Sequence, residues 1–356
     1  MILSSSIHQL CQISLLLVSF IHLADGATSS RKQQVLGLEP LTGNFPKIIT
    51  GLYGSPPKIQ VHDPQGNASW SWDANTGLSK VPGTLRRCIQ GGWSATEVKV
   101  VAKGTKIVAI IGYSAVVIKY TPREQDDKMV EFAVCLNGKL GNAHTVEMLP
   151  GNLLAIATTG QKQDAGIWVY DSNRMTNSPK PIQIIPGVRA IHGMLWDQTA
   201  QTLWAAGNTD AADGTGGVSY GIIQGYKYDQ IRNRLTKGAS YTMTFARQLG
   251  TEWEGTPFAK WWDGPHDLVP VPSQRVLLFP TDRDIHAINL STGVFNHNGT
   301  QLEMQYLRGF RELGNRTGYN KEHLPRSDIK SRKVSGRRQA LKIPSAAQTI
   351  DQLRDC

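Results

Sequence analysis

The sequence predicts an all-β fold, a six- or seven-bladed β-propeller with four-stranded blades. Helical periodicity is almost absent, and short apolar runs alternate with Gly, Pro, Asn and Asp, which is typical of many short strands. Similar strand endings also recur, closing at positions 63, 121, 171, 229 and 290, with spacings of 58, 50, 58 and 61 residues. A four-stranded blade takes about 40–50 residues, and loop insertions would account for the excess.

A second repeat runs in phase with the first. Three times, a histidine precedes a short strand, a tight turn and a buried strand, beginning at His144, His192 and His266. Residues 95–112 read similarly but have no histidine. A propeller is the architecture that arranges such repeated units around an axis without long exposed edges. Five clear blades can be counted between Lys47 and Phe295. Residues 304–309 with 340–343 are candidates for a sixth.

The chain divides into four predicted parts. Residues 13–23 are apolar, too short to span a bilayer, which needs roughly 20 residues. Small residues follow at Ala24 and Gly26, which favours a secretory signal and a secreted, extracellular protein. The predicted parts are a signal peptide (1–26), an N-terminal segment that would complete a blade (27–44), the propeller (45–310), and a basic tail, partly disordered or closing the last blade (311–356).

Charge and processing motifs fit this division. The chain carries a net charge of +10, but residues 316–356 hold ten Lys and Arg against four Asp and Glu, a net of +6. The remaining body is nearly neutral, so we expect no nucleic-acid partner, no membrane contact after signal removal, and a monomer. Cys88 and Cys135 are the natural disulfide pair once Cys11 leaves with the signal. The predicted N-glycosylation sites are Asn67, Asn289, Asn298 and Asn315.

The three repeat histidines are the leading site candidates. If they begin innermost strands, they would converge on the mouth of the axial channel, where they suit a general base, a metal site or recognition of an acidic ligand. They would equally serve to tie loops together by hydrogen bonds. We assign His144, His192 and Arg189 as the catalytic candidates. The cofactor is unknown, and a divalent metal held by His144, His192 and His266 is one option.

Aromatic and basic residues near the same positions predict ligand binding. Exposed Trp stacks on the apolar face of a sugar, and an Arg fork holds a carboxylate. The substrate-binding candidates are His266, Trp93, Trp262 and Arg308. Glu147, Asp197 and Asp267 are acidic candidates, but no carboxylate pair forms a recognisable glycosidase motif. No G-x-S-x-G elbow, P-loop or Rossmann fingerprint occurs.

Several segments resemble an uncharacterised family of secreted fungal and bacterial β-propeller proteins. They are residues 69–73, 142–150, 192–197 and 264–270. The architecture is also similar to that of propeller polysaccharide lyases of the rhamnose–glucuronate type. That similarity implies β-elimination beside a uronate carboxylate, with His144 or His192 as base and Arg189 or Arg308 neutralising the carboxylate.

Three functions therefore stay open. The first is a carbohydrate-active lyase that cleaves uronate-containing glycans at an axial His/Arg pocket. The second is a non-catalytic propeller that binds a glycan, a protein or a small molecule. The third is a tailoring enzyme of a secondary-metabolite pathway, since propellers host unrelated chemistries.

Overall fold

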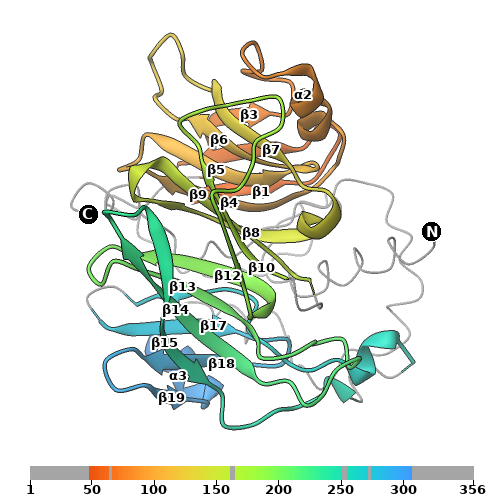
Figure 1. Cartoon of the computed structure of the whole chain (residues 1–356), viewed down its shortest axis with the longest axis vertical. Helices are drawn as coiled ribbons and strands as arrows, with labels where there is room; N and C mark the ends of the chain where they lie inside the picture. Colours follow the sequence, from red (N-terminus) through yellow and green to blue (C-terminus); the bar gives the residue numbers. More distant parts are fainter. Residues whose placement is uncertain (1–47, 64–65, 161–164, 251–254, 272–273, 307–356) are drawn as a thin grey trace, which may run out of the picture.

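The computed structural model describes residues 48–306, apart from 64–65, 161–164, 251–254 and 272–273. This part of the chain is all-β and forms five antiparallel sheets that follow one another along the sequence (Figure 1). Four sheets have four strands and the first has three, each in simple meander order. Such consecutive four-stranded meanders are consistent with a β-propeller.

The strand bounds follow the sequence repeat. The first sheet contains β1 (Ile48–Leu52), β2 (Lys58–His62) and β3 (Ala68–Asp73). The second contains β4 (Ala95–Val101), β5 (Lys106–Ile111), β6 (Ser114–Lys119) and β7 (Val130–Cys135). The third contains β8 (Ala143–Leu149), β9 (Leu153–Thr158), β10 (Gly166–Asp171) and β11 (Gln183–Pro186). The fourth contains β12 (Arg189–Asp197), β13 (Thr202–Asn208), β14 (Gly221–Asp229) and β15 (Arg234–Thr242). The fifth contains β16 (Val269–Pro270), β17 (Val276–Pro280), β18 (Ile285–Asn289) and β19 (Val294–Asn296).

Short helices connect or flank the sheets. They are α2 (Gly83–Gln90), α3 (Gly299–Tyr306) and the 3₁₀ turns Gly138–Leu140, Pro150–Asn152 and Pro257–Lys260. Helix α2 buries Leu85 and Ile89. It also carries Cys88, which forms the expected disulfide with Cys135 at the end of β7, with the two Cα atoms 5.5 Å apart. Among the described residues, no helix is long and apolar enough to cross a bilayer.

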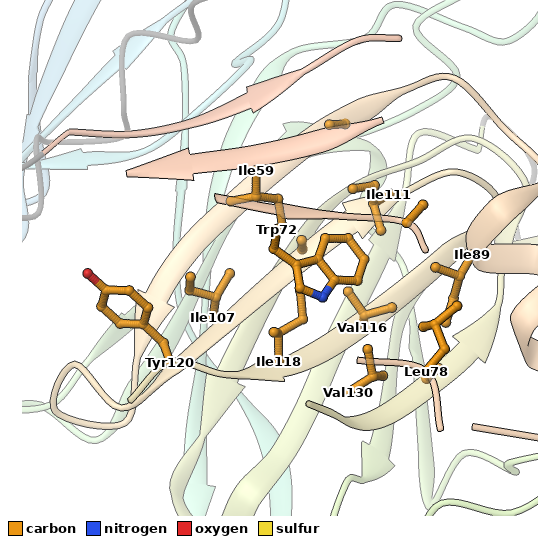
Figure 2. Close-up of a cluster of buried hydrophobic side chains, with 14 of the residues drawn as sticks. Ile59, Trp72, Leu78, Ile89, Ile107, Ile111, Val116, Ile118, Tyr120 and Val130 are labelled. Carbon is orange, nitrogen blue, oxygen red and sulfur yellow. The ribbon is translucent and has the colours of Figure 1, made fainter. Parts of the chain in front are cut away.

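The hydrophobic core lies between successive sheets. One apolar cluster joins the first and second sheets, around the fully buried Trp72 (Figure 2). Further clusters join the second to the third, the third to the fourth, and the fourth to the fifth. Strands near the axis are therefore covered on both faces, as in β5 and β9, whereas β11 and β15 at the outer edge alternate with exposed positions. Face-to-face packing of this kind buries continuous Val, Ile, Leu and Ala runs.

Asx turns explain the recurrent strand endings. Asp171, Asp229 and Asn289 close the third strand of their sheets, and each side chain accepts the backbone N–H two residues on, at 2.9–3.0 Å. Asp and Asn favour such turns because a short side-chain oxygen can replace a backbone acceptor. By the same repeat, β2 corresponds to a third strand, so β1–β3 match the second to fourth strands of the other sheets.

The described residues therefore contain five blades, the first without a counterpart of the innermost strand. The prediction of six or seven blades is not confirmed. The predicted signal, the segment 27–44, the sixth-blade strand 340–343 and the tail 311–356 all lie outside the described residues, as do Arg308 and Asn315. The other sixth-blade candidate, 304–309, was wrong where it is described, because residues 304–306 lie in helix α3. Of the other predicted glycosylation sites, Asn67 and Asn298 are exposed and Asn289 is half-buried.

Candidate functional site

Three histidines from successive blades lie in contact. His144 is in β8, His192 is in β12, and His266 comes just before β16. The ring centroids of His144 and His192 are 5.0 Å apart, and those of His192 and His266 are 4.4 Å apart. All three are half-buried. We call these three residues the histidine row. The structure thus brings together the histidines that begin the repeated units.

The strand register is irregular at two of the three histidines of the row. The register between β8 and β9 shifts between Ala143 and Thr145, and that between β12 and β13 shifts between Arg189 and Gly193. His144 and His192 lie within these irregular stretches. A bulge turns a side chain out of the regular alternation of a strand. Gly193 then allows close approach of the next blade, because a Cβ there would lie 2.7 Å from the Cα of Asp267.

One nitrogen of each ring has a defined polar partner. His192 Nδ1 lies 2.8 Å from the carbonyl oxygen of Ala190, which can only accept, so this nitrogen carries a proton. His144 Nε2 lies 3.1 Å from Oδ1 of Asn142, and His266 Nε2 lies 3.0 Å from Oδ1 of Asp282. In the neutral rings, the lone pair then belongs to Nε2 of His192 and to Nδ1 of His144 and His266.

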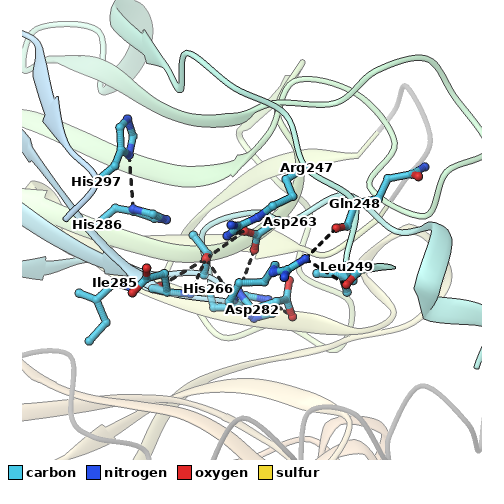
Figure 3. Close-up of polar contacts among 12 residues, drawn as sticks. Arg247, Gln248, Leu249, Asp263, His266, Asp282, Ile285, His286 and His297 are labelled. Atoms are coloured by element: carbon cyan, nitrogen blue, oxygen red, sulfur yellow. Dashed lines mark hydrogen bonds and ion pairs between the residues drawn. The ribbon is translucent and has the colours of Figure 1, made fainter. Parts of the chain in front are cut away.

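Asp282 is held in turn by a polar network (Figure 3). Its backbone N–H donates to Oδ1 of Asp263 at 3.0 Å, and Arg247 donates to Oδ2 of Asp263 at 3.2 Å. Burial raises the pKa of Asp263 above its ordinary value, and the nearby Asp282 adds to the rise. Arg283 donates to the carbonyls of Gln248 and Leu249. The chain segment that carries Asp282 is therefore anchored by hydrogen bonds from its backbone and from the neighbouring Arg283.

Arg189 lies near the carboxylate of Asp210. The backbone N–H groups of Ala211 and Gly217 lower the pKa of the Asp210 carboxyl, and the positive charge of Arg189 contributes to the same shift. Arg189 thus lies within electrostatic range of a carboxylate of its own blade.

The two candidate tryptophans have different surroundings. Trp93, two residues before β4, is 40% exposed and contacts Tyr53 edge to face, with ring centroids 5.1 Å apart. Trp262 is half-buried, and its backbone N–H donates to the carbonyl of Ala212 at 2.7 Å. Of the two, Trp93 has the surface that could stack on a sugar.

An ion cluster lies deeper on the same inner strands. Lys99 in β4 donates to Oε2 of Glu147 in β8 at 3.2 Å, and to the carbonyl of Met194 in β12 at 2.7 Å. Glu97 and Asp267 also act on Lys99 electrostatically. All four ionisable side chains belong to residues at most 9% exposed. We call Glu97, Lys99, Glu147 and Asp267 the axial ion cluster.

Three carboxyls share one ammonium in the axial ion cluster. Burial alone would lower the pKa of Lys99, but attraction by Glu147, Glu97 and Asp267 outweighs it and the pKa is raised. Burial raises the pKa of Glu147, against the attraction of Lys99. Glu147 and Asp267 were acidic candidates from the sequence, whereas Glu97 and Lys99 were not. The available signal was a pair of charged residues two positions apart, Glu97 and Lys99, in the strand 95–101, whose other residues are apolar apart from Thr96.

The histidine row does not fit the metal site considered from the sequence. Its rings meet by faces and edges, with interplanar angles of 87° and 40°. Within the described residues, no group of three or more His, Cys, Asp or Glu side chains is arranged to hold a metal ion. The row is instead held by contacts of its ring nitrogens with oxygen atoms.

Comparisons with known proteins give distant structural similarities only. No protein-family model matches the chain, and no curated protein matches it. A Bacteroides uniformis structure, named provisionally as a 6-phosphogluconolactonase, has 13% identity and a TM-score of 0.43, covering 72% of this chain and 68% of that one. The periplasmic gluconolactonase of Pseudomonas aeruginosa has 12% identity and a TM-score of 0.40, with coverages of 70% and 65%. The PQQ domain of Coprinopsis cinerea pyranose dehydrogenase has 13% identity and a TM-score of 0.38, covering 71% of this chain and 78% of that one.

Similarities of this size carry no conclusion about activity. They also give no support to the expected resemblance to propeller polysaccharide lyases. A hypothesis about the function of this chain therefore has to come from its own residues. The three contacting histidines and the carboxylates beside them are the best candidates for a site.

Proposed function

We propose that the protein is a secreted acid–base enzyme that hydrolyses a lactone or ester of a sugar-like small molecule at the histidine row. The observation that supports this is the contact of three imidazoles, each with one ring nitrogen hydrogen-bonded to an oxygen atom. Histidine transfers protons near neutral pH, and positioned general acids and bases accelerate reactions by about 10²–10⁴-fold.

In this proposal His192 is the general base. Its Nδ1–H donates to a backbone carbonyl, which puts the lone pair of the neutral ring on Nε2. In the proposed step Nε2 takes a proton from water as the water attacks the acyl carbon. The C–O bond to the leaving group then breaks, and the leaving oxygen takes a proton. His266 suits that second role because Asp282 stabilises its protonated form. His144 would position the substrate or the water.

Elimination from a uronate is served less well by this arrangement. That reaction needs a cation that neutralises the substrate carboxylate before the adjacent C–H becomes acidic. Within the part of the chain that the structure describes, Arg247 pairs with Asp263, and Arg189 lies near Asp210. Hydrolysis needs a base and an acid without that cation, which is why we prefer it.

The test is turnover by the purified full chain. Proton release would be followed against a panel of sugar lactones and sugar esters, and absorbance near 235 nm against uronate-containing glycans in parallel. We expect hydrolysis of at least one lactone or ester, and about 10²-fold or greater loss of kcat in His192→Asn with unchanged thermal unfolding.

His62→Asn is the matched control. The ring nitrogens of His62 contact Thr50 Oγ1 and the carbonyl of Gly66, away from the row, so this variant should keep full activity. Wild-type activity in His192→Asn would refute the assigned base. Absorbance at 235 nm without lactone or ester hydrolysis would favour the lyase, and binding of panel compounds without turnover would favour a non-catalytic binding propeller.

A further inference from the structure

Two exposed aromatic side chains lie at one end of the second blade. Among the described residues, the exposed large apolar side chains include only two aromatic ones, Trp93 (40% exposed) and Tyr113 (55% exposed). Trp93 lies two residues before β4, and Tyr113 lies in the turn between β5 and β6. The carbonyl of Ser94 accepts the backbone N–H of Gly112 at 2.9 Å, so the residues next to these lie on adjoining segments. We call Trp93 and Tyr113 the aromatic pair.

Glycine residues let the turn that carries Tyr113 pack closely against the segment that leads to Trp93. A Cβ at Gly91 would lie 3.1 Å from Cδ2 of Tyr113, so this ring rests on bare backbone. A Cβ at Gly92 would lie only 2.7 Å from the Cα of Gly112, whose own φ of +59° also favours glycine. The sequence therefore places a side chain that is large and exposed on a support that has none.

Further contacts hold the aromatic pair in place. The carbonyl of Trp93 accepts the N–H of Gly54 at 2.9 Å, and its ring contacts Tyr53 edge to face. The N–H of Tyr113 donates at 2.8 Å to the carbonyl of Cys88, a residue that the disulfide ties to the end of β7. Groups that are already positioned lose less conformational entropy when a ligand binds.

The aromatic pair lies at the end of the blades that also carries the histidine row. Lys99 is the fifth residue of β4, and it bonds to Glu147, the fifth residue of β8. As equivalent first strands of successive blades, β4 and β8 run in the same direction, and this contact shows that they are nearly in register. The start of β4, which Trp93 precedes, is therefore next to the start of β8, where His144 lies.

We propose that Trp93 and Tyr113 bind sugar rings of a glycan, and that the acyl group hydrolysed at the histidine row is an ester or lactone of that glycan. An aromatic ring stacks on the apolar C–H face of a pyranose, and both rings of the pair are accessible for such contact. The role of the bound glycan as substrate rests on the proposed function, whereas its binding to the aromatic pair does not.

The size and the chemistry of this surface favour a glycan over a protein partner. A stable protein interface buries about 800 Å² on each side, which is more than two aromatic side chains of about 150–250 Å² supply. The amide side chains of Gln90 and Asn137 are exposed on the neighbouring segments, and amides both donate to and accept from hydroxyl groups. Asn137 follows Leu136, whose backbone N–H donates to the carbonyl of Tyr113 at 2.8 Å.

Oligosaccharide binding by the full chain tests the proposal. Calorimetric titration would use unesterified sugars (cellohexaose, xylohexaose, mannohexaose and hexagalacturonate), so that binding is measured without turnover. We expect at least one of them to bind, and affinity to fall about tenfold in Trp93→Ala and in Tyr113→Ala. Tyr113→Phe keeps the ring and should retain the binding.

Ile231→Ala is the matched control. Ile231 is 95% exposed in the turn between β14 and β15, at the opposite end of its blade from the start of β12, so this variant should bind as the wild type does. If Trp93→Ala fails to fold, Tyr113→Ala decides the outcome. Absence of binding to all four sugars, or unchanged affinity in folded Tyr113→Ala, would overturn the proposal. Ring-dependent binding together with no hydrolysis of any ester or lactone would support the aromatic pair and refute the proposed function instead.

Discussion

The histidine row and the axial ion cluster lie on the same inner strands but at different depths. His144 is second in β8, and Glu147 is three residues further along the same strand. The rings of the row are half-buried and bond to a carbonyl, an amide and a carboxylate. The ions of the cluster are buried and satisfy one another. Three residues along one strand thus separate the half-buried imidazoles, which are the proposed catalytic groups, from buried ions that connect three blades.

The largest expected effect follows from removing the single cation of the cluster. Lys99→Met leaves Glu147, Glu97 and Asp267 buried without their counterion and frees the carbonyl of Met194. Breaking a buried ion pair from one side costs about 3–5 kcal/mol. We expect a loss of that size in the free energy of unfolding, measured by urea denaturation. The double variant Lys99→Met/Glu147→Gln should recover part of it, and a loss below about 1 kcal/mol in the single variant would refute the cluster's structural role.

The pH dependence of stability should reveal the carboxyl excess of the cluster. Because burial raises the pKa of Glu147, the folded protein releases this proton at a higher pH than the unfolded chain does. Its contribution is therefore fully present below the ordinary glutamate pKa and is lost as pH rises through the folded-state value. Urea denaturation should be measured from the ordinary glutamate pKa upward. The free energy of unfolding should fall with rising pH in the wild type, and this fall should be absent in Glu147→Gln. Identical pH profiles would contradict the shift.

A smaller effect on stability is expected at the row. Asp282→Asn removes the carboxylate beside His266, and the two side chains are 17% and 29% exposed. Partly solvated pairs contribute about 0.5–1 kcal/mol, so thermal unfolding should change little. The same variant should weaken proton donation by His266, which lowers kcat and shifts the pH–rate profile while KM stays near the wild-type value. A pure stability defect with an unchanged profile would remove Asp282 from the proposed site.

The smallest change in the free energy of unfolding is expected at a lysine that, like Lys99, pairs with a glutamate but is more exposed to solvent. Lys106 in β5, the strand next to β4, pairs with Glu131 at 2.9 Å, with side chains 24% and 34% exposed. Exposed pairs of this kind contribute roughly 0–1 kcal/mol. Lys106→Met should therefore change the free energy of unfolding by less than about 1 kcal/mol under the conditions used for Lys99→Met. Equal losses in the two variants would show that depth does not set the difference.

The histidine row was accessible to sequence reasoning because it follows the repeat. Each of its residues occurs at a similar place in a repeated unit, and chain connectivity in a meander brings equivalent positions of successive blades together. The ion cluster was not accessible, since a lysine and glutamates within strands read equally well as solvated side chains. The contact between His286 and His297 on the β18–β19 hairpin was not predicted either. Strand ends and turns are common places for histidines that have no functional role.

The sequence by itself determined the short strands, the Asx turns that close them, the order of the blades and the pairing of Cys88 with Cys135. These depend on local chemistry and on a repeat that can be counted along the chain. Only the tertiary structure decided which polar side chains became partners. Whether Lys99 meets Glu147, whether Asp282 faces His266, and whether His286 contacts His297 depends on bulges, register and blade packing. Those separations are set by contacts between residues far apart in the sequence.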